Sequence, residues 1–291
     1  MKLQTSLKKQ WAEWGPDFLA GAVLNVLKSQ SDLEVWEWMD GQKFSTEGNR
    51  FKIDQTPYLR EPMQAYRDPM VKTVVVIAPA QSGKTTMSEG CISYAISEMG
   101  GNLIFYGPTN DDTNEFMDTR MELHYKKLPR LSRLAHPEAS KNKRQLKIHI
   151  DGSWFAALSG NNRKKLQSRT AKRVHGDEVA SWPEGHAEEA KARTIRFDKT
   201  SSKHLFCSTP EEMYLPQKMG DSELSPTEFY ALWLAGTQKE WGVTCPECGE
   251  WTPLGLANFE WSNEDGEAPK DESGNWIWTV SYTHLTLPTK A

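Results

Sequence analysis

The pattern of apolar and polar residues predicts a strand followed by a helix in the first third of the chain. Residues 71–78 (Val-Lys-Thr-Val-Val-Val-Ile-Ala) are rich in β-branched side chains and predict a buried parallel strand. Residues 85–97 follow, with apolar side chains recurring near one helical face, and predict a helix. Strand, loop and helix therefore come in that order.

Other segments predict the rest of a sheet. Residues 103–106 and 205–208 are short apolar runs typical of strands, and residues 147–158 predict a hairpin that turns at Asp151-Gly152. Strands that alternate with helical segments indicate an α/β fold, with a parallel-rich sheet flanked by crossover helices.

Changes in composition and residue pattern divide the chain into four segments. Residues 1–50 predict an N-terminal helical extension with a stop at Gly41, and residues 51–240 predict the main α/β domain. Residues 241–280 predict a small module in which cysteines and tryptophans stand among acidic and glycine-containing stretches. Residues 281–291 fit nothing before them and resemble a translated sequencing adapter, so we expect a non-native tail and a natural chain that continues further.

Composition narrows the setting of the protein. With 291 residues and 37% hydrophobic content, the chain can form one substantial core and a small appended module. The apolar run at residues 18–27 is too short and too interrupted to cross a bilayer, so we expect a buried amphipathic helix and no membrane partner. Four cysteines without a secretory signal predict a reducing, cytoplasmic compartment.

Charge is distributed unevenly along the chain. The net charge of −4 argues against a uniformly basic nucleic-acid coat. Between Lys126 and Arg173, however, fourteen basic residues stand against only Glu138 and Asp151. This basic stretch predicts either a solvated surface or contact with phosphates of a polyanion or nucleotide.

Residues 78–86 (Ala-Pro-Ala-Gln-Ser-Gly-Lys-Thr-Thr) join the first predicted strand to its helix, the context that a phosphate-binding loop requires. Gly83 would let the backbone approach the phosphates, Lys84 would neutralise their charge and Thr85 would bind Mg²⁺. Ala78 replaces the usual first glycine, and a structural turn is the alternative. The residues predicted to hold the nucleotide are Gln81, Ser82, Gly83, Lys84, Thr85 and Thr86.

Two later motifs carry candidate chemistry. Asp177 and Glu178 are adjacent carboxylates, of which the first would bind Mg²⁺ and the second would polarise the attacking water. The residues before them are polar where a buried strand would be aliphatic, so a solvated turn is the alternative. Ser208-Thr209-Pro210 ends a predicted strand and could bring hydroxyls near the γ-phosphate, or could simply form a turn.

The pair Cys245 and Cys248, in Cys-Pro-Glu-Cys-Gly, has a spacing that lets two thiolates bind one Zn²⁺. Cys91 and Cys207 lie in predicted core elements, so the pair supplies only half of a tetrahedral site. A redox pair is the alternative, but the flanking residues lack the strand and helix that such a site needs.

Taken in order, these motifs resemble the large terminase subunits of tailed phages, in the lambda-like family. The resemblance covers residues 50–260 and includes Pro-Tyr-Leu-Arg-Glu-Pro-Met at residues 57–63. It implies a P-loop NTPase core of the RecA-like (ASCE) type that hydrolyses ATP with Mg²⁺ to move double-stranded DNA into a procapsid. A nuclease domain would follow downstream, and a second cysteine pair would complete a zinc-ribbon-like module.

The resemblance also implies partners and residue roles. The partners would be the terminase small subunit, the portal protein of the procapsid and further copies of the chain, in the cytoplasm of the host cell. Tyr58 would stack on the adenine, with a buried core tyrosine as the alternative. Ser208 and Thr209 would couple hydrolysis to DNA movement.

Two questions stay open at the level of sequence. An arginine should stabilise charge on the transferring phosphoryl group, and the candidates are Arg169, Arg173, Arg193 and Arg196. A helicase-like ATPase with the same core and a DNA-binding assembly protein with an inactive nucleotide site are the alternative functions. The absence of a later helicase motif with an arginine pair disfavours the first, and ATP turnover would separate the second.

Overall fold

The computed structural model describes residues 32–46, 48–197, 201–210, 227–244, 249–253, 281–282 and 285–286. The chain divides into two compact units, residues 1–236 and 237–291. Cys245 and Cys248 lie outside the described residues, as do residues 1–31 of the expected N-terminal extension. The predictions made for these segments therefore stay predictions.

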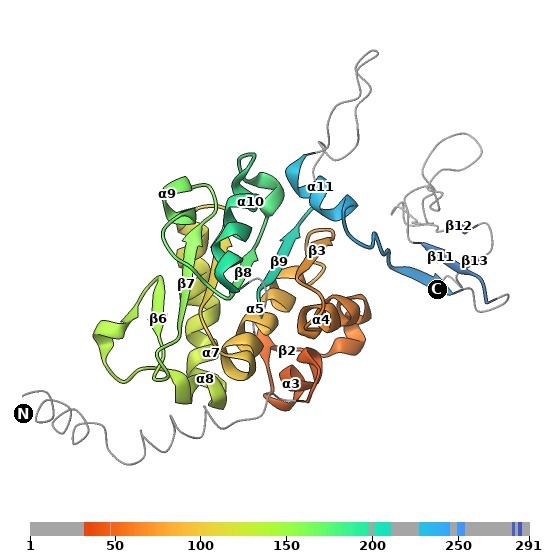
Figure 1. Ribbon diagram of the computed structural model, residues 1–291. Coiled ribbons are helices and arrows are strands. Elements are labelled where there is room, and N and C mark those ends of the chain that lie inside the picture. The colour runs from red at the N-terminus through yellow and green to blue at the C-terminus, as the bar shows by residue number, and fades with distance from the viewer. Residues whose placement is uncertain are drawn as a thin grey trace, which may run out of the picture. The chain divides into compact units, whose positions relative to one another are not determined.

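A mixed, mostly parallel seven-stranded sheet forms the centre of the first unit (Figure 1). Its order is β3-β9-β8-β4-β7-β6-β5; the first five strands are parallel, and β6 and β5 are antiparallel to their neighbours. The carboxyl ends of the parallel strands therefore meet at one edge of the sheet. The strands are β3 (Thr73–Ile77), β4 (Leu103–Gly107), β5 (Asn142–Lys143), β6 (Leu146–Ile148), β7 (Trp154–Ser159), β8 (Arg173–Gly176) and β9 (Lys203–Ser208).

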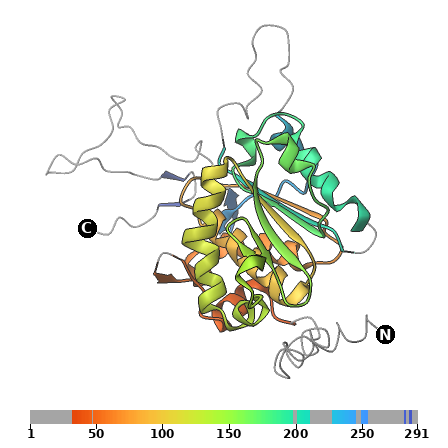
Figure 2. The ribbon, with the colours of Figure 1, turned by 90° about the vertical axis from the view of Figure 1, so that its left-hand side faces the viewer.

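Helices cover both faces of this sheet (Figure 2). The α-helices are α3 (Val35–Gly41), α4 (Arg60–Arg67), α5 (Lys84–Tyr94), α6 (Asn110–Glu115), α7 (Glu122–Lys127), α8 (Pro129–Leu134), α9 (Arg163–Leu166), α10 (His186–Lys191) and α11 (Glu228–Leu234). Two π-helical segments, η3 (Ala95–Met99) and η4 (Phe116–Met121), follow α5 and α6. Short 3-10 helices are η1 (Ile53–Gln55), η2 (Pro57–Leu59), η5 (Ala139–Lys141), η6 (Val179–Ser181) and η7 (Ala192–Phe197).

Side-chain alternation along the strands produces two cores. In β4, Leu103 and Phe105 belong to the core shared with α3, α4, α5, α7 and α8. Ile104 and Tyr106 belong to the core shared with α9, α10 and α11. Successive residues of a strand point to opposite faces, so one buried strand contributes to both layers.

The predicted strands and the hairpin are confirmed, as is the α/β fold with its parallel-rich sheet. β6 and β7 pair antiparallel, with Ile148 opposite Trp154, and Gly152 in the turn has a φ of +83°. The helix α3 ends at Gly41 as expected. This helix is part of the first core, however, because Val35, Trp38 and the nearby Phe44 are fully buried there.

The strand β8 is the main difference from expectation. Its residues, Arg-Val-His-Gly, are polar enough that no buried strand was predicted, yet all four are buried between β9 and β4. Arg173 donates hydrogen bonds to the carbonyl oxygens of Met99 and Gly100, and His175 Nε2 lies 2.8 Å from Tyr66 Oη. Internal hydrogen bonds thus replace part of the hydration that these side chains lose on burial, while Arg173 Nε and His175 Nδ1 are buried without a hydrogen-bond partner in the described structure.

Three two-stranded ribbons complete the described structure. β1 (Ser45–Thr46) pairs with β2 (Asn49–Arg50) in the first unit. In the second unit, β10 (Gly242–Thr244) pairs with β11 (Trp251–Pro253), and β12 (Ser281–Tyr282) pairs with β13 (Leu285–Thr286). Among the described residues, no helix is long and apolar enough to span a membrane.

Candidate functional site

The loop between β3 and α5 has a curled backbone. Gln81 has a φ of +60°, an uncommon value for a residue with a side chain, and Gly83 has a φ of +79° at the N-cap of α5. A Cβ on Gly83 would lie 3.2 Å from Leu59 Cδ1, so this position combines a left-handed backbone with a close neighbour. The loop therefore enters an eleven-residue helix through a conformation that glycine favours.

Two polar groups of this loop are buried, the ammonium-bearing side chain of Lys84 and the hydroxyl of Ser82. Lys84 is only 5% exposed, and its Nζ donates to the carbonyl oxygen of Pro79 at 2.9 Å. Ser82 Oγ is buried and has no hydrogen-bond partner in the described structure. Tyr58 Oη donates to the carbonyl oxygen of Ser82 at 3.0 Å and so lies against the loop. A buried cation and a buried hydroxyl without a partner in the same loop fit an anionic ligand.

Asp177 stands directly after β8 and faces the start of α5. Thr85 Oγ1 donates to Asp177 Oδ2 at 3.4 Å, and the backbone N–H of Asp177 donates to Tyr106 O at 2.9 Å. Burial raises the pKa of Asp177 to about 6, and the neighbouring charge of Glu178 acts in the same direction. A buried carboxylate next to a second carboxylate and a hydroxyl is a donor set that fits Mg²⁺.

Glu178 is held by the hydroxyl turn that follows β9. Its Oε2 accepts hydrogen bonds from Thr209 Oγ1 at 2.8 Å, from Thr209 N at 3.1 Å and from Ser208 Oγ at 3.2 Å. Its backbone is left-handed, with φ and ψ of 46°. Three donors on one oxygen fix the orientation of this carboxylate at the carboxyl edge of the sheet.

The structure brings the three predicted motifs together because β9 lies between β3 and β8. The backbone N–H of Ala78 donates to Ser208 O at 3.2 Å, and the N–H of Ala180 donates to Ser208 Oγ at the same distance. Ser208 therefore contacts both the phosphate-loop side and the carboxylate side. Gln81 is exposed and Thr86 is half-buried in the first turn of α5.

Two supporting residues escaped the sequence analysis. Trp182 Nε1 donates to Asp177 O at 3.2 Å, and its ring fills the space where Cβ atoms on Gly160 or Gly176 would clash. His175 anchors β8 to Tyr66, and burial lowers its pKa to about 3, so it is neutral at physiological pH. Trp182 lies only five residues from Asp177, but no sequence pattern marks this contact, and Tyr66 lies 109 residues from His175.

The four candidate arginines separate by environment. Arg173 is 2% exposed and committed to backbone carbonyls in the core, which removes it as a candidate for phosphoryl contact. Arg193 donates to Glu189 O at 3.3 Å and to Gln167 O at 3.1 Å. Arg169 and Arg196 are exposed, and Arg169 lies over the ring of Trp154.

Several cations of the basic stretch form ion pairs within the chain. Arg130, Arg144, Lys147 and Arg163 form ion pairs with Glu98, Asp118, Glu122 and Glu189 respectively. These acids come from other parts of the chain, so a count along residues 126–173 overstates the local charge. Contact of the remaining exposed cations with phosphates stays a prediction, with a solvated surface as the alternative.

Comparisons with known proteins find relatives among the large subunits of phage terminases. A family model described as "Phage terminase large subunit gpA, ATPase domain" matches residues 45–277. The large terminase subunit of Escherichia phage lambda is 24% identical over 323 residues, which cover 90% of this chain and 49% of that relative. The large terminase subunit of Enterobacteria phage P21 is 26% identical over 198 residues, which cover 65% of this chain and 29% of the relative.

A solved structure shows the same fold. The large terminase of the HK97 bacteriophage superposes with a TM-score of 0.51 at 12% identity, covering 69% of this chain and 40% of that chain. This chain thus spans about half of the lambda relative and smaller shares of the other two.

Proposed function

Because the chain belongs to the phage terminase large subunit gpA family and carries its ATPase domain, we propose that its site binds ATP with Mg²⁺ and hydrolyses ATP to move double-stranded DNA into a procapsid. The observation that carries this proposal is the meeting of Thr85, Asp177 and Glu178 at one edge of the sheet, across 92 residues of sequence separation. The contact between Asp177 and Thr85, the residue that follows Gly83-Lys84, is not expected if the acidic pair lies on a solvated turn.

Each residue of the site then has a distinct task. The loop backbone from Gln81 to Gly83, with the side chains of Ser82 and Thr86, would hold the phosphates, and Lys84 would neutralise their charge. Thr85 and Asp177 would hold Mg²⁺, which when bound supplies positive charge to the phosphate oxygens. Tyr58 lies beside the loop, where its ring could cover the adenine.

Glu178 is the proposed proton acceptor for the attacking water. Its Oε2 is already occupied by three donors from Ser208 and Thr209, which leaves Oε1 to orient the water and take its proton. The same bonds connect the carboxylate to the end of β9. Ser208 and Thr209 would therefore transmit a change at the carboxylate to the segment that follows β9, which is the proposed coupling to DNA movement.

The wider roles of the protein are part of this proposal. The terminase small subunit, the portal protein and further copies of the chain would be its partners, in the cytoplasm of the host cell. Cys245 and Cys248 would bind Zn²⁺ when a second pair of ligands is present. A nuclease domain would belong to the longer protein, as the share of the lambda relative that lies outside the match allows.

Phosphate release by the purified chain tests the proposal directly. The parent should hydrolyse ATP only with Mg²⁺, and Lys84→Ala should lower kcat/KM by about 10²- to 10³-fold while the melting temperature changes little. Lys127→Ala removes an exposed lysine elsewhere and should leave turnover unchanged. A parent without turnover, or a Lys84→Ala variant as active as the parent, would overturn the assignment.

A further inference from the structure

A cavity lies beside β5, β6 and β7, away from β3 and the loop before α5. The cavity has a volume of about 520 Å³ and is lined by Asn114, Lys143, Arg144, Gln145, Leu146, Leu158 and Arg169. Its walls come from β5, β6, β7, α6 and the segment after α9. β7 is four strand spacings from β3, about 19 Å, so the cavity is separate from the loop before α5.

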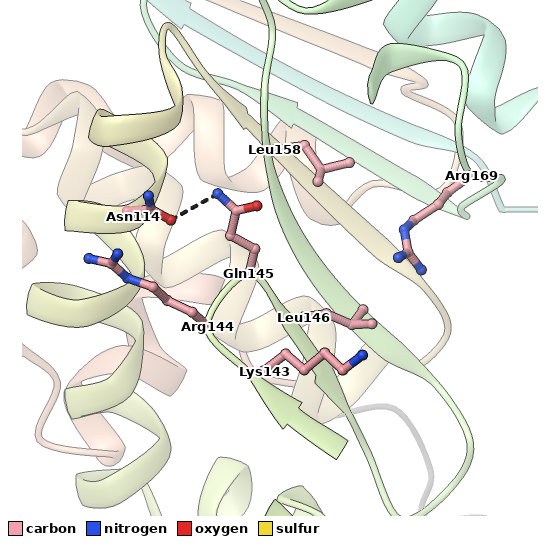
Figure 3. Close-up of a pocket in the computed structure, with 7 residues that line it drawn as sticks. All are labelled: Asn114, Lys143, Arg144, Gln145, Leu146, Leu158 and Arg169. Carbon is pink, nitrogen blue, oxygen red and sulfur yellow. Dashed lines mark hydrogen bonds between the residues drawn. The ribbon is translucent and has the colours of Figure 1, made fainter. Parts of the chain in front are cut away.

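Two cations of this cavity are available to a ligand. The lining contains no carboxylate. Arg144 is committed to Asp118, with Nε 3.0 Å from Oδ2, and Figure 3 shows its side chain directed toward the helix that carries Asn114. Lys143 and Arg169 are exposed, and within the described residues neither forms an ion pair. Figure 3 shows Lys143 beside Leu146, with Arg169 on the neighbouring segment that borders the same cavity.

The cavity is prearranged by contacts within the chain. The guanidinium carbon of Arg169 lies over the ring of Trp154, 5.4 Å from the ring centroid, a cation–π contact that holds this side chain beside the cavity. Gln145 Nε2 donates to Asn114 Oδ1 at 2.8 Å, and Lys147 pairs with Glu122, so the β5–β6 hairpin is attached to the neighbouring helices. Leu146 and Leu158 contribute an apolar part to the lining beside these cations.

From this arrangement we propose that the cavity is a second phosphate-binding site, in which Arg169 binds two phosphate oxygens through its guanidinium and Lys143 supplies a second positive charge. A planar fork facing a point charge matches a phosphate group better than a single carboxylate, which one arginine satisfies. The phosphate can come from the backbone of DNA or from a nucleotide. Only the first source rests on the proposed function.

Binding of two probes tests the site. A labelled mixed-sequence DNA duplex is titrated by fluorescence anisotropy at several salt concentrations, with the parent and with the Lys143→Gln/Arg169→Gln pair. We expect the pair to bind about tenfold more weakly, and the slope of log affinity against log salt to flatten by up to about two units, a little under one per phosphate contact. The control pair Lys127→Gln/Lys164→Gln removes the same charge from exposed positions of the same stretch outside the cavity and should stay near the parent.

Calorimetric titration with pyrophosphate separates the sources. It is performed in a Lys84→Ala background, so that the loop before α5 does not contribute. Loss of pyrophosphate binding with the cavity pair, but little loss of DNA binding, assigns the site to a nucleotide; loss of DNA binding assigns it to the DNA backbone. If the cavity pair and the control pair behave alike with both probes, the proposal is overturned.

A conservative variant and melting temperatures test this interpretation further. Arg169→Lys keeps the charge but loses the planar fork and the stacking on Trp154, so its affinities should lie between those of the parent and Arg169→Gln. Melting temperatures identify any variant that fails to fold. Failure of the proposed function would appear as a parent without ATP turnover, whereas failure of the cavity would appear as unchanged binding of both probes.

Discussion

The strands β3 and β8 end at the same site but are built in opposite ways. β3 is aliphatic, Thr-Val-Val-Val-Ile, yet it is the first strand of the sheet and four of its five residues are only partly buried. β8 is polar, Arg-Val-His-Gly, yet it lies between two strands and is buried throughout. The polar strand occupies the centre because its side chains find partners there. The hydropathy of a strand therefore does not by itself predict whether the strand lies at the edge or in the centre of the sheet.

The residue that follows the polar strand should show the largest effect. Glu178→Gln keeps the shape of the side chain and its acceptor for Ser208 and Thr209, but it cannot take a proton from water. We expect kcat to fall by about 10²- to 10⁴-fold with nucleotide affinity retained. Turnover and equilibrium nucleotide binding are measured together, with Glu184→Gln, an exposed carboxylate nearby, as the matched control.

Equal and mild losses in Glu178→Gln and Glu184→Gln would place the acidic pair on an ordinary turn. Asp177→Asn sharpens the result, because it should change the Mg²⁺ concentration required for turnover more than Glu178→Gln does.

Unfolding by urea compares the two strands directly. His175→Ala leaves a space in the core and a buried Tyr66 hydroxyl without its partner, so we expect a loss of about 2–4 kcal/mol in the free energy of unfolding. Val76→Ala in the edge strand should cost about 1 kcal/mol, because that side chain is already partly exposed. If the aliphatic substitution costs as much as the polar one, the contrast between the strands does not hold.

Acidification should lower the free energy of unfolding through two buried histidines, His175 in β8 and His149 after β6. Burial lowers the pKa of His175 to about 3 and that of His149 to about 4. The unfolded chain therefore takes up these protons below its ordinary histidine pKa of about 6.5, whereas the folded chain does not. Each histidine should reduce stability by up to about 1.4 kcal/mol per pH unit from pH 6.5 down to its folded pKa.

Asp177 acts in the opposite direction over part of this range. Its folded pKa of about 6 lies above its usual value, so the folded chain binds that proton more tightly and recovers some stability below pH 6. Chemical unfolding at several pH values should give a shallower slope for His175→Phe than for the parent.

The smallest expected effect concerns Mg²⁺. Because a protonated carboxyl does not bind the ion, Mg²⁺ affinity measured with ADP should fall as the pH drops through about 6. Glu178→Gln removes a like charge beside Asp177, so the midpoint should move to lower pH by less than about one unit. A midpoint that stays in place would show that burial alone sets the pKa of Asp177.

Residues near one another in sequence were predicted well. The strand before the loop, the helix after it and the hairpin at Asp151-Gly152 all follow from β-branched runs, helical periodicity and turn residues. The order of loop, carboxylates and hydroxyl turn was also sufficient to indicate the family. The uneven charge of residues 126–173 was visible in sequence, but its meaning was not.

The local elements and the chemical types of the site residues could be predicted from the sequence, because propensity, periodicity and turn chemistry act over a few neighbours. The burial of β8 could not, since Tyr66 lies 109 residues from its hydrogen-bond partner His175. Two other features depend on contacts between distant residues: Thr209 donates to Glu178 across 31 residues, and Arg144 pairs with Asp118 whereas Lys143 and Arg169, beside the cavity, form no ion pair within the described residues. Burial and charge balance depend on partners that only folding brings into contact.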